Sequence, residues 1–240
     1  MLSLPTLPTT LQANLHALHE RITKAARASG RDPSSVRLLA VSKAFPATVI
    51  AEAARAGQRA FGENYVQEAL AKMDELVNLA ERPLEWHFIG PIQSNKTRAI
   101  AQAFDWVQSV DRLKIAERLA EQRPANLPLL NVLLQVNVSG EASKAGVAPD
   151  QLSQLAAAVA QLPRLRLRGL MTIPAPEIDV ARQRSAFALT NTLFRQLRTG
   201  GFKVDVLSMG MSDDLEAAIA EGATMVRIGT AIFGARARSR

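Results

Sequence analysis

The chain has 240 residues, of which 48% are hydrophobic and 21% charged, a composition typical of a globular protein with a sizeable core. The absence of cysteine excludes disulfide scaffolds, thiolate metal sites and cysteine nucleophiles. The formal net charge is +7, but the basic residues are spread along the chain apart from a short ARARSR tail. No aromatic residues alternate with that tail, so nucleic-acid binding is not expected.

Membrane and metal sites are not expected either. No apolar stretch reaches transmembrane length, and the first residues, MLSLPTLPTT, lack the basic start and unbroken apolar segment of a leader. We therefore predict a soluble cytoplasmic protein with a loose N-terminus over residues 1–9 and a basic tail over residues 236–240. The three histidines, His16, His19 and His87, form no ligand cluster, so no metal site is predicted.

The predicted elements begin with a helix and then alternate between strands and helices. Leu11, Leu15, Leu18 and Ile22 recur at helical spacing and predict a helix over residues 10–29. The apolar runs that follow, each predicted to form a strand, are RLLAVSK (37–43), RAFGEN (59–64), EWHFIG (85–90), DWVQSV (105–110), LLNVLLQVNV (129–138), LRGLMTI (167–173), VDVLSMG (204–210) and TMVRIG (224–229). The helical patterns after them span residues 46–57, 66–81, 94–103, 112–122, 149–162, 179–201 and 213–223.

This alternation predicts an α/β protein. Eight strand-like runs separated by helices, within about 200 residues, favour a single (β/α)8 or TIM barrel over residues 10–235, preceded by one extra helix. A doubly wound open sheet is the alternative, although such sheets usually have fewer strands. Because barrel active sites lie at the carboxyl ends of the strands, polar residues that end these runs are expected to meet at one mouth.

The first strand ends on a lysine. Side chains alternate between the two faces of a strand, so Leu39, Val41 and Lys43 share a face, and Lys43 is expected to point inward at the mouth. Most lysines in this position begin a solvated loop, and the residue alone favours that role. The alternative is a desolvated amine that attacks a carbonyl to form a Schiff base.

The last two strands end in glycines and hydroxyl residues. Ser208, Gly210 and Ser212 follow one another after the seventh, and Gly229 and Thr230 follow the eighth. Glycine allows backbone N–H groups to approach an anion, and the loops after strands seven and eight of a barrel frequently bind phosphate. Ordinary turns are the alternative, but two such segments at these two strands favour a phosphate site.

Arg227 lies within the eighth strand. Val226 and Ile228 are expected to face the surrounding helices, which points Arg227 into the barrel. A buried structural ion pair is one explanation. The other is donation to a ring nitrogen, since arginine is one known partner of the pyridine nitrogen of pyridoxal 5′-phosphate. An amine for the aldehyde, a phosphate cradle and a guanidinium for the ring nitrogen together match the three polar groups of that cofactor.

Four further residues are weaker candidates. Asn64 ends the second strand, where it would either hydrogen-bond the cofactor's phenolic oxygen or form a turn. His87, between two aromatic residues in mid-strand, is expected to be a satisfied core histidine rather than a catalyst. Lys144 is expected to be solvated in a loop on the active face. Tyr65 lies beside Asn64 and could approach the cofactor; no role is assigned to it.

Several segments together resemble the pyridoxal phosphate homeostasis protein family, over roughly residues 8 to 235. They are LLAVSK, FGENYVQEALAK, WHFIGPIQSNK, VNVSGEASKAG, RGLMTIP and LSMGMSDDLEAAIAEGATMVRIGTAIFG. The resemblance implies a barrel like the N-terminal domain of alanine racemase, with pyridoxal 5′-phosphate bound to Lys43 as a Schiff base. It also implies that Ser208, Gly229 and Thr230 hold the phosphate and Arg227 the pyridine nitrogen. The predicted cofactor-binding set is Lys43, Asn64, Ser208, Met209, Gly210, Arg227, Gly229 and Thr230.

The chain also departs from the racemases. It ends just after the eighth predicted strand, which leaves no room for the β-rich second domain from which racemases draw a catalytic tyrosine. An arginine also keeps the pyridine nitrogen largely unprotonated, because two positive charges would repel. We therefore expect a non-catalytic, monomeric carrier that buffers the cofactor and supplies it to apo-enzymes. The alternatives are a single-domain racemase or lyase that uses the cofactor, and a Schiff-base aldolase that binds a phosphorylated sugar without it.

Overall fold

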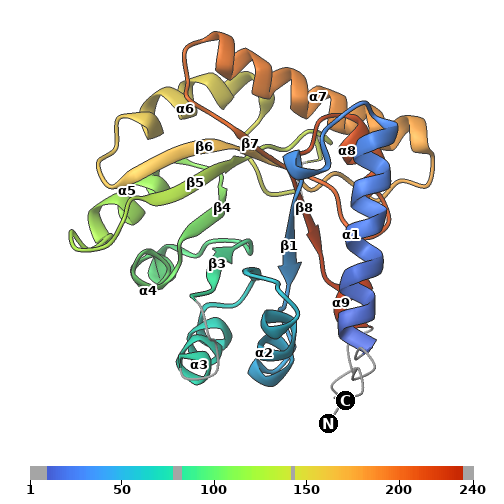
Figure 1. Cartoon of the computed structure of the whole chain (residues 1–240). Coiled ribbons are helices and arrows are strands. Elements are labelled where there is room, and N and C mark those ends of the chain that lie inside the picture. Colours follow the sequence, from blue (N-terminus) through green and yellow to red (C-terminus); the bar gives the residue numbers. More distant parts are fainter. Residues whose placement is uncertain (1–9, 78–82, 142–143, 235–240) are drawn as a thin grey trace.

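The structure is a computed structural model that describes residues 10–77, 83–141 and 144–234. In this part of the chain, parallel strands close into a barrel in the order β1 to β8, and helices surround the barrel (Figure 1). The (β/α)8 fold and its extra N-terminal helix are thereby confirmed. The predicted loose segment 1–9 and basic tail 236–240 lie outside the described residues.

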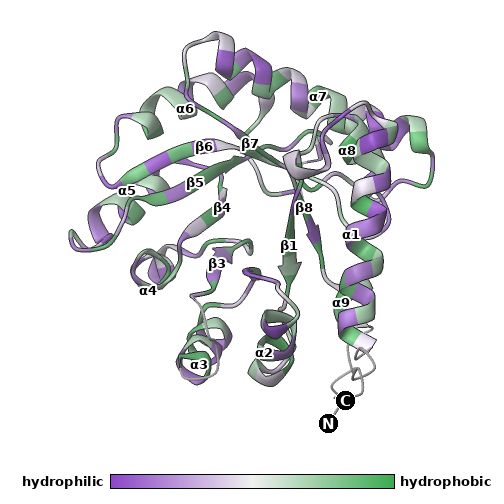
Figure 2. Ribbon diagram, viewed as in Figure 1, coloured by the Kyte–Doolittle hydropathy of each residue, from purple (hydrophilic) through white to green (hydrophobic). Residues whose placement is uncertain are grey.

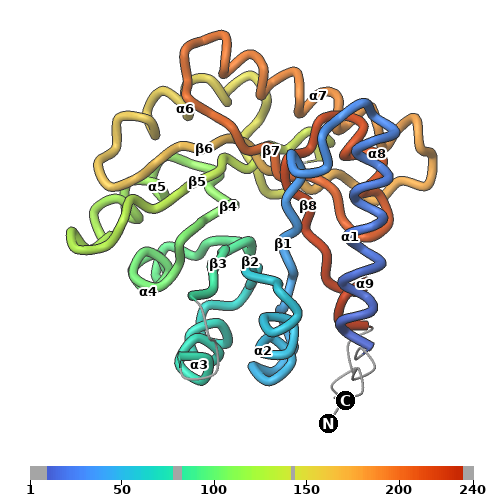
Figure 3. Tube along the Cα trace, viewed as in Figure 1, coloured from blue at the N-terminus to red at the C-terminus, as the bar shows by residue number. Residues whose placement is uncertain are grey.

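The limits of the elements agree closely with the sequence pattern, and the Cα trace can be followed in Figure 3. The strands are β1 (Arg37–Val41), β2 (Ala60–Glu63), β3 (Glu85–Phe88), β4 (Trp106–Val110), β5 (Leu130–Gln135), β6 (Leu165–Met171), β7 (Val206–Ser208) and β8 (Met225–Ile228). The α-helices are α1 (Thr10–Ala28), α2 (Ala47–Arg55), α3 (Val66–Leu76), α4 (Thr97–Ala103), α5 (Leu113–Gln122), α6 (Leu152–Ala160), α7 (Val180–Thr199), α8 (Leu215–Ala220) and α9 (Thr230–Phe233). Single 3-10 turns are η1 (Pro33–Ser35), η2 (Ser94–Lys96) and η3 (Pro149–Gln151).

Two apolar layers result from the alternation of side chains along the strands. One face of the strands points into the barrel, where a compact cluster forms from Leu39, Ala60, Trp106, Leu133, Met171, Val206 and Met225. The other face packs against the helices in a larger cluster that includes Leu38, Ala40, Val226 and Ile228. The helices turn hydrophilic residues toward solvent (Figure 2). Residues two positions from a member of the inner cluster along a strand share its face and therefore reach the barrel interior, even when they are polar.

The barrel closes between its first and last strands. β1 pairs in parallel with β8, and Leu39 lies opposite Arg227. Helix α1 packs against α8 and α9 beside this seam. The side-chain amide of Asn14 in α1 donates to the Ile232 carbonyl at 2.9 Å, and Arg21 forms an ion pair with Glu216. The extra helix therefore covers the seam at which the two ends of the barrel sequence meet.

Two classes of site are absent from the described part of the chain. None of its helices is both long and apolar enough to cross a membrane. Nor do its histidine, aspartate and glutamate side chains gather in any group of three that could hold a metal ion. In a barrel of this kind, the polar residues at the carboxyl ends of the strands are the candidates for a functional site.

Candidate functional site

A cavity of about 230 Å³ opens at the carboxyl ends of the strands, on the side of the barrel where β8 meets β1. It is lined by Val41, Lys43, Asn64, Ile89, Ile173, Met211, Ser212, Asp213, Arg227, Gly229 and Thr230. Five residues of the predicted set are among these: Lys43, Asn64, Arg227, Gly229 and Thr230. The structure thus brings together the amine, the guanidinium and the loop after β8.

The other three members of the predicted set do not line this cavity. The Ser208 hydroxyl is buried inside the barrel, where it donates to Gln108, and Met209 is fully buried in the outer core. Gly210 has a φ of 95°, and a Cβ there would come within 2.5 Å of the Ala218 Cβ, so this glycine serves a sharp turn packed on α8. After β7, the lining of the cavity comes instead from residues 211–213.

Lys43 lies in a tight turn directly after β1 and is half-buried. The next residue, Ala44, has a φ of 65°, a left-handed conformation that is unfavourable for any residue other than glycine. The Ala44 N–H donates to Glu68 Oε1 at 2.5 Å. The turn that presents Lys43 is thus strained, and a carboxylate from α3 holds it in place.

A buried ion pair braces the same turn from behind. Lys72 of α3 donates to Glu63 Oε1 at 2.8 Å and to the Ser42 carbonyl at 2.9 Å, and it also pairs with Glu68 at 2.5 Å. The Ser42 hydroxyl donates to the same Glu63 oxygen at 2.7 Å. Burial raises the pKa of Glu63, against the opposing effect of these donors. Because the contacts hold the residues on both sides of Lys43, they fix its backbone.

Arg227 is buried, and two hydrogen bonds fix the plane of its guanidinium. Its two terminal nitrogens donate to the Ser208 hydroxyl at 2.9 Å and to the Thr172 carbonyl at 2.8 Å. Burial lowers the pKa of Arg227 to about 10, so the group stays charged at neutral pH. A guanidinium has five N–H donors, and these two bonds leave others for a ligand in the cavity that Arg227 lines.

His87 is fully buried in the barrel interior and hydrogen-bonded on both ring nitrogens, which confirms the prediction of a satisfied core histidine. Its Nε2 lies 2.7 Å from Glu85 Oε1, and Arg37 donates to the same carboxylate oxygen at 2.8 Å. Burial acts to raise the pKa of Glu85, but the His87 hydrogen bond and the Arg37 charge outweigh it and lower that pKa to about 2. Burial lowers the pKa of His87, which therefore stays neutral at neutral pH.

These contacts predict a pH-dependent contribution of Glu85 to stability. The folded pKa of about 2 lies below the usual 4.5, so the contribution is complete above pH 4.5 and declines as the pH falls toward 2. Since the side chain is about a third exposed, we expect solvent screening to reduce it to about 1–2 kcal/mol. Urea denaturation of the apoprotein should show Glu85→Gln to be less stable than the wild type by this amount at pH 7. The stability difference between the variant and the wild type should shrink below pH 4.5. A difference that stays constant with pH would contradict the lowered pKa of Glu85. The control is Glu117→Gln, at an exposed position.

Two other residues considered in the sequence lie outside the cavity. Tyr65 is 61% exposed and faces a neighbouring hollow that it shares with Asn64, Gln93 and Lys96. Lys144 is half-buried in the loop after β5 and does not contribute to the lining. Neither residue is placed to act directly on a molecule bound beside Lys43.

Sequence reasoning missed the residues that support the site. Glu63 and Lys72 brace the Lys43 turn, and Gln108 contacts Ser208 inside the barrel. One signal could have found Gln108: it follows Trp106 at the two-residue spacing of an inward-facing strand position. Ser212 lines the cavity, whereas the predicted set contained Ser208 from the same segment.

Comparison with known proteins gives consistent matches. The alanine racemase N-terminal domain family matches residues 13–237. A pyridoxal phosphate homeostasis protein of Pseudomonas aeruginosa is 64% identical over 227 residues, covering 95% of this chain and 96% of that protein. The protein of the same name from Escherichia coli strain K12 is 57% identical, with 95% and 97% covered. The solved structure of PipY from Synechococcus elongatus, with pyridoxal phosphate bound, has a TM-score of 0.80 at 38% identity and covers 94% of this chain and 100% of PipY.

Proposed function

Because the chain belongs to the alanine racemase N-terminal domain family, and within it to the pyridoxal phosphate homeostasis proteins, we propose that it carries pyridoxal 5′-phosphate on Lys43. Its role would be to keep the free aldehyde scarce in the cytoplasm and to supply the cofactor to other proteins. The observation that carries the proposal is the convergence of Lys43, Arg227, Gly229 and Thr230 on one cavity.

The residues of the cavity fit this cofactor. The side-chain oxygen of Asn64 is buried without a hydrogen-bond partner at the edge of the cavity, which suits a contact with a ligand group that can donate. At Gly229 a Cβ would lie 3.1 Å from the Val41 carbonyl oxygen, so a side chain there would crowd this backbone. The N–H groups that begin α9, from Thr230, have no carbonyl partner within their helix and suit an anion. The buried guanidinium suits a ring nitrogen.

Two side chains have defined tasks toward the bound group. The cofactor supplies an aldehyde that condenses with a primary amine, with loss of one water molecule. Lys43 provides that amine, and the braced turn around it fixes where its side chain starts. Arg227 keeps its own proton at neutral pH and donates a hydrogen bond, which leaves the ring nitrogen unprotonated because two adjacent positive charges repel. An unprotonated ring withdraws electrons poorly, so Arg227 disfavours chemistry on a bound amino acid.

The lining of the cavity also favours a carrier over a racemase. Racemisation needs two acid/base groups, one on each face of the substrate. Among the residues that line the cavity, Lys43, Asp213 and Arg227 have ionisable side chains, and Asp213 is exposed. Tyr65 lines the neighbouring hollow instead. The ionisable side chains that line the cavity are thus one amine, one guanidinium and one exposed carboxylate.

The mouth of the cavity is open enough for the cofactor to be exchanged. Ile173 and Met211 line it and are each 40% exposed, so the mouth opens to solvent. An incoming amine, or the lysine of an apo-enzyme, could therefore reach a cofactor held there. We propose that the protein acts as a monomer in this exchange, with apo-enzymes that use the cofactor as its recipients.

Two measurements on the purified protein test the function. The cofactor-loaded protein should absorb in the visible range, and treatment with borohydride should fix the label on a single peptide that contains Lys43. Incubation with amino acids in heavy water should leave the α-proton in place on the timescale of enzyme turnover. Rapid α-proton exchange would establish the racemase or lyase alternative. A colourless protein that takes up no added cofactor would contradict both this alternative and the proposed carrier function.

Thr230 offers a direct test of the phosphate contact. Because this residue is exposed, its replacement should not disturb folding. Thr230→Val is expected to weaken cofactor binding by about 1–3 kcal/mol, the cost of losing a hydrogen bond to a charged group. Equilibrium titration of the apoprotein with pyridoxal 5′-phosphate measures the change, with exposed Thr192→Val of α7 as the control. An affinity equal to that of the wild type would remove Thr230 from the phosphate site.

A further inference from the structure

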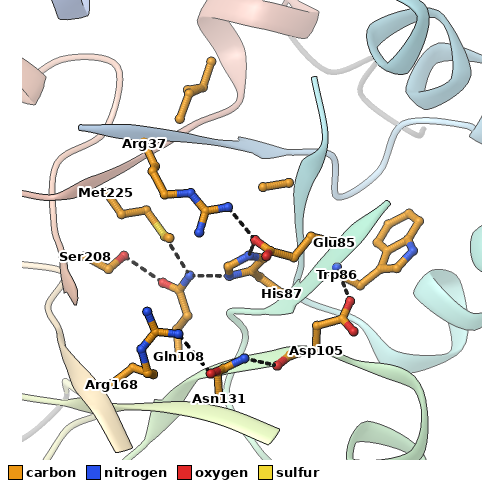
Figure 4. Close-up of polar contacts among 12 residues, drawn as sticks. Arg37, Glu85, Trp86, His87, Asp105, Gln108, Asn131, Arg168, Ser208 and Met225 are labelled. Carbon is orange, nitrogen blue, oxygen red and sulfur yellow. Dashed lines mark hydrogen bonds and ion pairs between the residues drawn. The ribbon is translucent and has the colours of Figure 1, made fainter. Parts of the chain in front are cut away.

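A line of polar side chains crosses the barrel interior, from the cavity to the opposite side of the barrel. It begins at Arg227, passes through Ser208, Gln108 and His87, and ends on the Glu85 carboxylate; Figure 4 shows the part from Ser208 to Glu85. Ser208, Gln108 and His87 are each at most marginally exposed. Burying this many polar groups is costly unless each has a partner, and here each has one.

The contacts of this line are short and continuous. Arg227 donates to the Ser208 hydroxyl at 2.9 Å, and Ser208 Oγ lies 2.7 Å from Gln108 Oε1. The Gln108 amide nitrogen lies 2.8 Å from His87 Nδ1, and His87 Nε2 lies 2.7 Å from Glu85 Oε1. The residues come from four different strands, β8, β7, β4 and β3, and so the line depends on the closed barrel.

Glu85 fixes the direction of every hydrogen bond in the line. An ionised carboxylate can only accept, so His87 Nε2 carries the proton and donates. In a neutral imidazole, Nδ1 is then the acceptor, and the nitrogen of Gln108 must be the donor to it. The Gln108 oxygen consequently faces Ser208 and accepts its hydroxyl proton. The lone pairs of Ser208 are left for Arg227.

The surroundings of His87 preserve this arrangement. Its ring stacks on Trp106 with centroids 5.1 Å apart and an interplanar angle of 8°. The Arg168 guanidinium lies over the Trp106 ring at 4.7 Å, and Arg37 approaches through Glu85. Asp105 is the further charged group near the ring. Burial and the Arg37 charge lower the pKa of His87 and outweigh Glu85 and Asp105, which act to raise it, so Nδ1 remains an acceptor at neutral pH.

We propose that Gln108 is a positioning residue that orients Arg227 toward the cofactor, with its own orientation set by His87 and Glu85. The inference rests on the proposed function and adds to it a second layer of residues. In its observed orientation Gln108 holds the Ser208 proton away from Arg227, and the guanidinium is then held at Ser208 and Thr172. If the Gln108 amide were absent or flipped, nothing would fix the direction of the Ser208 hydroxyl, and the Arg227 guanidinium would lose one of its two hydrogen-bond acceptors.

Replacement of Gln108 by methionine tests the proposal, because methionine fills the same space without an amide. Gln58→Met is the matched control, since Gln58 is also buried and hydrogen-bonded but contacts only the carbonyls of Leu38 and Ala60. Gln108→Met should bind pyridoxal 5′-phosphate about tenfold more weakly than the wild type and shift the pH dependence of its visible spectrum, while saturating cofactor still labels Lys43. Gln58→Met should change neither quantity, whatever its stability.

Wild-type affinity and spectrum in Gln108→Met would overturn the proposal while leaving the function of Lys43 intact. If borohydride labels no lysine of the wild type, the proposed function fails first and the inference with it. A second measurement needs neither cofactor nor variant. Nitrogen NMR of the apoprotein, in which only three histidines contribute, should show a His87 ring protonated on Nε2 and hydrogen-bonded but unprotonated on Nδ1. A proton on Nδ1 at neutral pH would contradict the direction of the line and overturn the proposal.

Discussion

Lys43→Ala is expected to abolish both the visible absorption of the bound cofactor and the adduct trapped by borohydride. Among the residues that line the cavity, Lys43 is the one with a primary amine, and alanine cannot condense with an aldehyde. Non-covalent contacts through Arg227 and the loop after β8 would remain, so weak binding without the covalent adduct should persist. Absorption spectra before and after borohydride, followed by peptide mapping, measure the loss.

Two further variants make this experiment specific. Lys43→Arg keeps a positive charge but has no condensing amine, and it should behave as Lys43→Ala does. Lys144→Ala removes a lysine on the same face of the barrel, outside the cavity, and should keep the full adduct. A full adduct in Lys43→Ala that maps to Lys144 would move the attachment point and refute the assignment.

The second large effect, a loss of folding stability, is expected when Lys72 is replaced. Lys72→Met leaves the buried Glu63 carboxylate without its ammonium partner, and breaking one side of a buried ion pair typically costs about 3–5 kcal/mol. The cost should fall as the pH drops through the raised pKa of Glu63, because the neutral acid needs no counter-charge. Chemical denaturation of the apoprotein at several pH values measures the free energy of unfolding.

The double variant Glu63→Gln/Lys72→Met separates the ion pair from the packing of Lys72. It should recover much of the stability lost in Lys72→Met, since no charge is then left buried. Its cofactor affinity should be lower than that of the wild type, as we also expect for Lys72→Met, because the Ser42 carbonyl lacks the ammonium that braces the Lys43 turn in both variants. A double variant as unstable as Lys72→Met would show that the charge is not the cause.

The barrel was predictable because each strand and helix has a local pattern. The helical spacing of Leu11, Leu15, Leu18 and Ile22 matches the buried face of α1, and the alternation in RLLAVSK placed Leu39 inside. Alternation also placed Arg227 in the interior, because its neighbours Val226 and Ile228 belong to the outer core. Period-two and helical patterns report which face is buried, so they locate side chains relative to the barrel without any knowledge of distant contacts.

The parts that could not be predicted depend on contacts between strands. Alternation could not distinguish Ser208 from Ser212, since both are hydroxyls in one glycine-containing segment. The turn at Gly210 decides that Ser212 lines the cavity and Ser208 does not. Likewise, Gln108 acquires its neighbours from β3 and β7, which the order of closure determines. Local periodicity contains no information on such pairings.

The pairing of β1 with β8 has a consequence for synthesis of the protein. The ribosome releases Lys43 well before Arg227, Gly229 and Thr230, and yet these residues line one cavity. A growing chain therefore has the proposed attachment lysine long before it has the other groups that we propose to hold the cofactor. Stable loading must therefore wait until β8 docks beside β1, and the colour of the loaded protein would report that the barrel has closed.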